Sequence, residues 1–154
     1  MTRAPIGSKA IVQVCFVTAK LERSATWFGD LLGLPVPEFI TSGAREEAAT
    51  EYLGQPSDAR CRMAFFKLDN LDIELIEPDG RPSCWREFLD RNGPGVHHLA
   101  FRVNGMAATI EGLEARGLAL LQKGEFSGGR YAYIDTEAHM GVLTELLEFD
   151  HSAS

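Results

Sequence analysis

The chain has 154 residues, with 22 acidic residues against 15 Lys and Arg, and a formal net charge of −7. This length suits one domain with a substantial core and is too short for two domains of ordinary size. The basic residues form no cluster that could neutralise phosphates, so we expect no nucleic-acid partner. No stretch approaches the roughly 20 apolar residues that cross a bilayer. We therefore expect a soluble, cytoplasmic protein with no membrane partner. The three cysteines lack the spacing of a disulfide framework or a metal site, which is typical of reduced thiols.

The first half of the chain predicts a β-α-β-β-β order. Residues 10–17 are rich in β-branched and aromatic side chains, as is typical of a strand. Apolar residues then recur at helical spacing up to Gly33, a residue that can end a helix: Leu21, Ala25, Phe28 and Leu32. The rest of this half predicts a short edge strand at Phe39 and Ile40, a long loop over 41–60, and strands over 61–68 and 71–77.

The second half repeats this order after a linker over residues 79–95. The linker carries three apolar residues at the spacing of a short helix: Trp85, Phe88 and Leu89. A strand begins at His98, and Asn104 is the predicted N-cap of a helix that ends at Gly117. Three short strands follow, over 118–122, 130–134 and 142–147, with a turn at Gly128-Gly129.

The two halves can be aligned with each other. Gln13-Val-Cys-Phe-Val-Thr matches His98-Leu-Ala-Phe-Arg-Val, and Ile73-Glu-Leu-Ile-Glu matches Thr144-Glu-Leu-Leu-Glu. The offset is 85 residues at the first match and 71 at the second, a difference that a longer loop over 41–60 would absorb. We interpret this as a duplication. A chance likeness between short apolar strands is the alternative.

Two glutamates carry the strongest chemical signal. Glu74 and Glu145 lie in the middle of mostly apolar strands, where an unpaired charge is costly. Either one alone would more often face a cleft or form a salt bridge than bind a metal. The duplication, however, places these two at equivalent positions, as it does Gln13 and His98, and all four are side chains that suit a divalent metal. We therefore predict one metal ion held by these four residues.

This arrangement resembles the vicinal-oxygen-chelate superfamily, which includes glyoxalase I, methylmalonyl-CoA epimerase, extradiol dioxygenases and antibiotic-resistance proteins. The segments Gly95-Val-His-His-Leu-Ala-Phe and Gly141-Val-Leu-Thr-Glu-Leu are similar to the epimerase branch, and the likeness spans residues 11–148. It implies an α+β fold in which two tandem β-α-β-β-β modules form a curved, partly closed mixed sheet around a metal cleft. One domain over residues 1–154 is expected, with module 1 about 10–78, a linker over 79–95 and module 2 about 96–149.

The resemblance makes the second histidine of the pair, His98, the ligand. Strand alternation agrees, because it turns His97 to the other face as a packing or surface residue. Three further side chains are predicted to contact the substrate: Arg102, Cys15 and His139. Arg102 lies on the ligand face by alternation and could bind a carboxylate or phosphate, or balance the acidic ligands. Cys15 should line the same cleft, and His139 lies in a turn that either reaches the substrate or is only solvated.

The chain also departs from the epimerase pattern. Gln13 stands where that pattern has histidine, and Glu74 where it often has glutamine. The set Gln, Glu, His and Glu is instead similar to the ligands of eukaryotic glyoxalase I, whose glutathione-binding basic residues have no clear counterparts here. A further acid that serves as a base in the epimerases matches near Gly54, or Glu51 if a small gap is introduced.

The resemblance implies a metal-dependent epimerase or isomerase that removes a proton next to a carbonyl. Glu145 is the first candidate base and Glu74 its partner, and the cofactor is one ion of Zn, Ni, Co, Mn or Mg. The alternatives are a glyoxalase I-like lyase and a non-catalytic, resistance-type protein that binds a small molecule. An extradiol dioxygenase would need two histidines and one carboxylate for Fe(II), so Gln13 argues against it. We expect a small α-carbonyl substrate and a homodimer.

Overall fold

The computed structural model describes residues 4–151, which form one ten-stranded mixed sheet and five helices. The strands are β1 (Ile11–Val17), β2 (Ile40–Thr41), β3 (Glu51–Tyr52), β4 (Gln55–Pro56), β5 (Cys61–Lys67), β6 (Asp72–Pro78), β7 (Gly95–Arg102), β8 (Leu120–Phe126), β9 (Gly129–Ile134) and β10 (Leu143–Phe149). The helices are α1 (Leu21–Leu32), α2 (Arg45–Ala48), α3 (Cys84–Asn92), α4 (Met106–Glu114) and α5 (Glu137–Met140). The order across the sheet is β2-β5-β6-β1-β7-β10-β9-β8-β3-β4.

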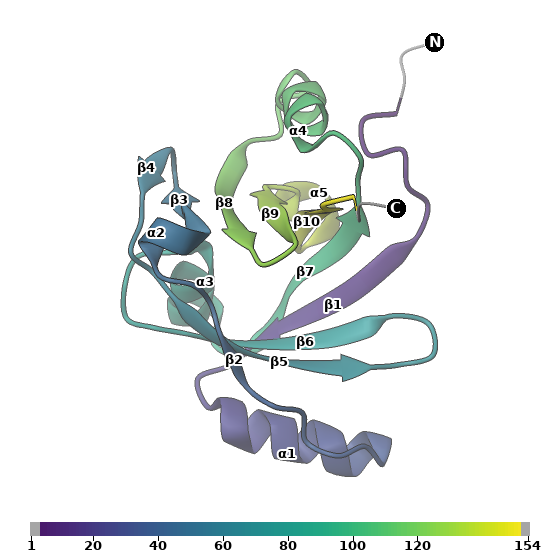
Figure 1. Cartoon of the computed structure of the whole chain (residues 1–154), viewed down its shortest axis with the longest axis vertical. Helices are drawn as coiled ribbons and strands as arrows, with labels where there is room; N and C mark the ends of the chain where they lie inside the picture. Colours follow the sequence, from purple (N-terminus) through teal and green to yellow (C-terminus); the bar gives the residue numbers. More distant parts are fainter. Residues whose placement is uncertain (1–3, 152–154) are drawn as a thin grey trace.

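The sheet consists of two similar halves that meet at β1 and β7. These two first strands pair antiparallel, and each also pairs in parallel with the last long strand of its own half, β6 or β10. Twist accumulates over so many strands, and the sheet curls into a half-barrel (Figure 1). The predicted α+β class and the two tandem modules are confirmed.

Helices α1 and α4 cover the outer, convex face at equivalent places in the two halves. Leu21 and Ala25 of α1 are buried against β5 and β6, and Met106 and Leu113 of α4 are buried against β9 and β10. Helix α1 ends where predicted, because Gly33 adopts the left-handed conformation with φ 67°. Among the described residues, no helix combines the length and the apolar character that crossing a membrane requires.

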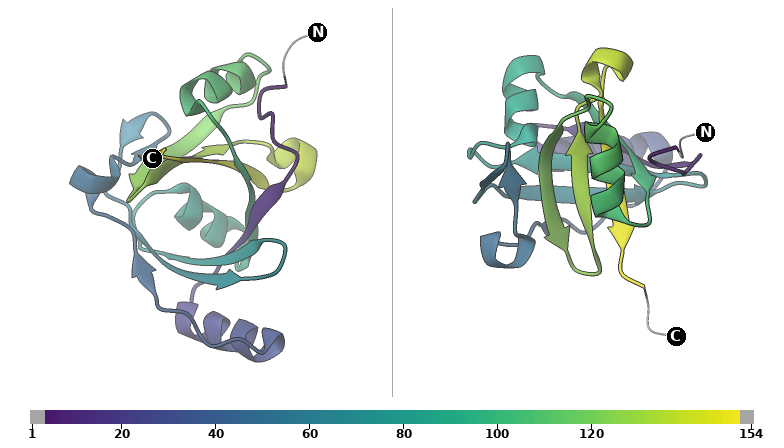
Figure 2. Two further views of the ribbon diagram at one scale, coloured as in Figure 1. Left: turned by 45° about the vertical axis from the view of Figure 1, so that its right-hand side comes forward. Right: turned by 90° about the horizontal axis from the view of Figure 1, so that it is seen from above.

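Helix α3, from the linker between the halves, lies inside the curl of the sheet (Figure 2, left). Its N-cap is Ser83, whose hydroxyl accepts a hydrogen bond from the backbone N–H of Arg86 at 3.0 Å. Trp85 and Leu89 are buried in the concave-side core, and the Trp85 indole N–H donates to the hydroxyl of Tyr133 at 2.9 Å. The concave face is therefore filled by this helix at one end.

The prediction of a long loop over residues 41–60 was wrong. That segment contains α2 and the short strands β3 and β4, and β3 extends the sheet by pairing with β8 through Glu51↔Lys123 and Tyr52↔Gln122. A two-residue strand has no periodic pattern of its own. It exists only because β8 offers an edge to pair with, and the local sequence does not reveal that partner.

The predicted N-cap of α4 was also wrong. The cap position is Gly105, not Asn104, and no side chain within the turn caps the helix. Instead a carboxylate oxygen of Glu148, on β10, accepts hydrogen bonds from the backbone N–H groups of Gly105 and Met106. A cap supplied from a distant strand leaves no local motif. Gly117 does adopt a left-handed φ of 82°, but three residues beyond the end of the helix.

Candidate metal centre

Four polar side chains from four strands meet on the concave face of the sheet. Nε2 of His98 lies 3.2 Å from Oε1 of Gln13, 3.5 Å from Oε1 of Glu74 and 3.1 Å from Oε2 of Glu145. All four residues are buried, with exposed fractions between 0% for His98 and 6% for Gln13 and Glu74. The structure thus brings together the four residues that the sequence predicted as ligands.

The pairing register explains this convergence. Two rows of lateral neighbours cross the sheet side by side: Glu74, Cys15 and His98 in one row, and Gln13, Ala100 and Glu145 in the next. Lateral neighbours on adjacent strands point to the same face. Ala100 is fully buried and carries only a methyl group, so the space between its two neighbours is left to their longer side chains.

The buried groups of the centre shift one another's pKa values. Burial, and after it the negative charge of Glu145, raises the pKa of Glu74 to about 8. Burial alone would lower the pKa of His98, but the carboxylates of Glu145 and then Glu74 outweigh it and raise that pKa. Burial and the neighbouring Glu74 raise the pKa of Cys15 well above the usual thiol value, which keeps Cys15 a neutral thiol.

The donor set fits a divalent cation. Oε1 of Glu74 and Oε2 of Glu145 are buried and have no hydrogen-bond partner among the described residues. Buried carboxylate oxygens without a partner are costly, and a cation removes that cost. Two carboxylates, one imidazole and one amide oxygen suit Mg, Mn, Co, Ni or Zn. Gln13 would contribute Oε1 and His98 Nε2.

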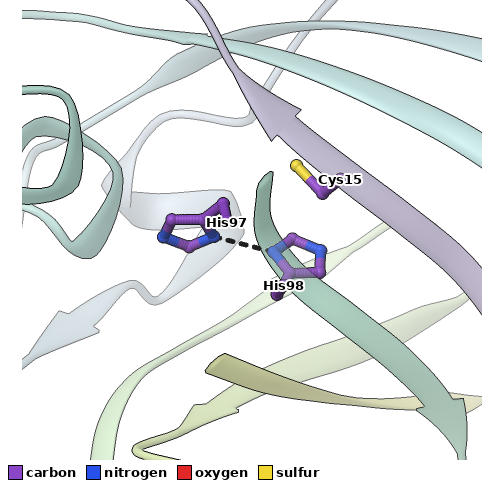
Figure 3. Close-up of side chains that lie close together, drawn as sticks. All are labelled: Cys15, His97 and His98. Atoms are coloured by element: carbon purple, nitrogen blue, oxygen red, sulfur yellow. Dashed lines mark hydrogen bonds between the residues drawn. The ribbon is translucent and has the colours of Figure 1, made fainter. Parts of the chain in front are cut away.

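Strand alternation predicted that His97 turns away from this centre, and the structure shows otherwise. Cys15 on β1 pairs with His98 on β7, but the next residue, Phe16, pairs with Val96. His97 is therefore left without a pairing partner on β1 and is the extra residue of a β-bulge. A bulge interrupts alternation. His97 is fully buried, and its Nδ1 lies 2.8 Å from Nδ1 of His98 (Figure 3).

A second group of possible ligands lies beside the four. The sulfur of Cys15 and ring nitrogens of His97 and His98 lie within 4.8 Å of one another (Figure 3). This trio suits a metal less well, because the two Nδ1 atoms are hydrogen-bonded to each other and are therefore not both free to bind an ion. The set of Gln13, Glu74, His98 and Glu145 is the better candidate.

The other predicted site residues lie in different surroundings. Arg102 is exposed, two residues beyond Ala100 on β7, and its guanidinium lies 4.4 Å from the ring centre of Phe149 in a cation–π contact. Cys15 lines the centre, as its place beside Glu74 and His98 shows. His139 is exposed on α5 and makes no hydrogen bond to any of the four ligands.

Glu51, the possible second base, points away from the centre. Its carboxylate lies 3.1 Å from Nζ of Lys123. The next residue, Tyr52, pairs laterally with Gln122 and packs against the concave-side core, so alternation places Glu51 on the convex face.

Sequence reasoning missed one large residue of the centre. Tyr133 pairs laterally with Glu145, is 2% exposed, and its ring centre lies 4.9 Å from that of His98. The strand that carries Tyr133 was predicted, but only the pairing register of β9 with β10 shows that Tyr133 is the residue beside Glu145.

A comparison with known families decides the classification. The model of the Glyoxalase/Bleomycin resistance protein/Dioxygenase superfamily matches residues 12–133. The chain belongs to this superfamily. The match includes Gln13, Glu74 and His98, and it ends before Glu145.

Two curated proteins resemble this chain over more than half of its length. The uncharacterised protein YqjC of Bacillus subtilis is 31% identical over 94 residues, which are 59% of this chain and 67% of YqjC. The ethylmalonyl-CoA/methylmalonyl-CoA epimerase of Cereibacter sphaeroides is 29% identical over 116 residues, which are 66% of this chain and 87% of the epimerase.

Solved structures of two methylmalonyl-CoA epimerases share the fold. The methylmalonyl-CoA epimerase from Mycobacterium tuberculosis has a TM-score of 0.65 at 22% identity, covering 98% of this chain and 93% of that chain. A variant of the Streptomyces coelicolor methylmalonyl-CoA epimerase, solved in complex with 2-nitronate-propionyl-CoA, has a TM-score of 0.58 at 19% identity, covering 92% and 98%.

Proposed function

We propose that this chain is a metal-dependent epimerase that moves a proton on the carbon next to the thioester carbonyl of a 2-branched acyl-CoA. The observation that carries the proposal is the pair of buried, unpartnered carboxylate oxygens, from Glu74 and Glu145, beside Nε2 of His98. The epimerases of this superfamily provide the substrate class. A divalent ion at this centre would stabilise the negative charge that develops on the carbonyl oxygen when the proton leaves.

The two glutamates have separate roles in this proposal. Epimerisation requires that a proton leaves one face of the carbon and returns to the other. Glu74 on β6 and Glu145 on β10 reach His98 from opposite sides of the central strand pair. Glu145 accepts the proton as general base, and Glu74 returns a proton as acid or acts in the reverse direction. Glu51 has no part in the proton transfer, because its side chain is bonded to Lys123 on the other face.

The substrate approaches along β7 from the second half. On the side of the central strands, Cys15 of β1 lies beside Glu74, whereas only the methyl group of Ala100 of β7 lies beside Glu145; Tyr133 lies on the other side of Glu145. Arg102 lies on the same face, two residues further along β7, where its fixed planar donors can bind a substrate carboxylate. A 2-carboxyacyl thioester offers both groups, a carbonyl for the centre and a carboxylate for Arg102.

The second candidate is a lyase of the glyoxalase I type. The ligand set of Gln, Glu, His and Glu favours it, because that set is similar to the ligands of the eukaryotic enzyme. Such a lyase would act on a hemithioacetal by the same proton abstraction next to a carbonyl. The two candidates therefore share a centre and differ in substrate.

Solvent exchange separates these functions. Methylmalonyl-CoA and ethylmalonyl-CoA, and separately the hemithioacetal of glutathione and methylglyoxal, would be incubated with metal-loaded protein in deuterated water and followed by NMR. The proposal expects the α-hydrogen of the acyl-CoA to exchange, and exchange should stop after chelation. Conversion of the hemithioacetal without exchange in the acyl-CoA would favour the lyase instead. A resistance-type protein would exchange neither compound.

Matched variants locate the chemistry. Glu145→Gln should abolish the exchange, because the amide cannot accept the proton. Glu125→Gln is the control, since Glu125 is exposed on β8 and should leave the rate unchanged. Elemental analysis of His98→Ala should show loss of the metal with the fold intact. Full metal content in His98→Ala and in Glu145→Gln would refute the centre itself.

A further inference from the structure

His97 and His98 form a pair of rings that is enclosed by the protein. Both residues are fully buried, and their Nδ1 atoms lie 2.8 Å apart. The His97 ring is packed edge-on against Phe88 and Tyr133, with ring centres 5.3 Å away in each case. Its orientation is therefore fixed by Phe88 and Tyr133, neither of which is a candidate ligand.

The bulge that holds His97 has a counterpart in the other half of the chain. The pairing of β1 with β7 has a second register shift, at Val12. Ile11 and Gln13 pair with two adjacent residues of β7, Phe101 and Ala100, so Val12 is the extra residue there. Val12 and His97 each directly precede a candidate ligand, and they are equivalent in the duplication. Both halves thus have a bulge before the ligand, but only the half with a histidine ligand has a histidine in the bulge.

A hydrogen bond between two Nδ1 atoms needs one proton, and the centre determines where that proton lies. A neutral imidazole carries one ring proton. If Nε2 of His98 binds a cation, the ring proton of His98 must lie on Nδ1, and Nδ1 of His97 must accept it. Gln13, the equivalent ligand of the first half, binds through an amide oxygen and has no tautomer to fix. An aliphatic bulge residue, Val12, is sufficient there.

We propose that His97 is a positioning residue that accepts the Nδ1–H of His98 and so keeps Nε2 of His98 free to bind the metal. This inference rests on the metal centre proposed above. Groups that hold the second nitrogen of a ligating histidine commonly change metal affinity about 10- to 100-fold when they are removed. Carboxylates and backbone carbonyls usually fill this role, whereas here a second imidazole fills it.

The test measures zinc affinity by competition with a chromophoric chelator. His97→Phe keeps an aromatic ring against Phe88 and Tyr133 but removes the acceptor, and it should weaken zinc binding about 10- to 100-fold. His97→Asn places an acceptor oxygen near the position of Nδ1 and should recover much of that loss. Val12→Ala, at the equivalent bulge, should change the affinity less than twofold.

A second measurement uses the unaltered, zinc-loaded protein and holds even if the phenylalanine variant does not fold. Nitrogen-15 NMR should find a proton on Nδ1 of His98 and none on Nδ1 of His97. A proton on Nδ1 of His97, or a His97→Phe affinity within twofold of the unaltered protein, would overturn the positioning role. His98→Ala distinguishes the two proposals: if it still binds zinc, the centre itself is wrong. If His98→Ala loses zinc and folded His97→Phe does not, only the role of His97 fails.

Discussion

The buried carboxylate of Glu74 should make the metal-free protein less stable as the pH rises. Its pKa is raised from 4.5 to about 8 by burial and by the charge of Glu145, so the folded state binds the proton more tightly than the unfolded chain does. This contribution to stability is therefore complete below about pH 4.5 and is lost as the pH rises through 8. At about 1.4 kcal/mol per pKa unit, the loss is about 3 kcal/mol at pH 7 and about 5 kcal/mol above pH 8.

Glu74→Gln removes the titrating group and keeps nearly the same shape. Urea unfolding of chelator-treated protein at several values between pH 5 and pH 9 should therefore show a steep loss of stability in the unaltered protein and a shallower one in the variant. The difference in slope is the test, since the buried amide has a desolvation cost of its own. Added metal should stabilise the unaltered protein more than the variant at the same concentration, because the carboxylate is the stronger ligand; a ligand present at 100 times its Kd stabilises by about 2.7 kcal/mol. Parallel pH curves for the two metal-free proteins would refute the reasoning.

Three other changes have separate expected outcomes. Ala100→Val adds two methyl groups between Gln13 and Glu145. It should lower the metal content sharply, measured by elemental analysis, and cost about 1–3 kcal/mol in unfolding free energy, measured by urea unfolding. Full metal content would contradict the idea that the small side chain of Ala100 leaves room for the ligands. Arg102→Lys keeps the charge but loses the planar fork, and should raise KM for the acyl-CoA about tenfold with little change in kcat, as steady-state kinetics would show; an unchanged KM would remove Arg102 from the substrate site. Burial would raise the pKa of Glu148, but its hydrogen bonds from the backbone of α4 outweigh burial and lower that pKa. The ionised carboxylate therefore stabilises the fold above about pH 4.5, and this stabilisation is lost in more acidic solution. Glu148→Gln should therefore cost about 1 kcal/mol at pH 7 and less at pH 3, measured by thermal unfolding.

The duplicated plan was predictable because it rests on local patterns. The strand over 10–17, the helix up to Gly33 and the two matching glutamate strands each have their own periodicity, and the structure confirms them. The four candidate ligands were also predictable, since a buried carboxylate recurring at equivalent places is not explained by packing alone. The structure places Nε2 of His98 within 3.5 Å of the other three side chains; their metal binding stays a prediction.

What the sequence could not provide are the features created by contacts between distant segments. The cap of α4 comes from Glu148, 42 residues after Met106, and the strand β3 exists only beside β8. Tyr133 likewise becomes part of the centre through its register with Glu145. Each of these depends on how strands align, which no single stretch of residues specifies.

The error over His97 has a more specific cause. Alternation assigns faces by counting along one strand, so a single inserted residue reverses the count for everything beyond it. In this chain the insertions come in a pair, at Val12 and His97, at the two ends of the ladder that joins β1 to β7. Between them the count is intact, which is why Gln13 and His98 were placed on the correct face. The two bulges therefore flank the centre. The ligands between them stay in register, and the bulge at His97 brings the His97 ring into contact with the ring of His98.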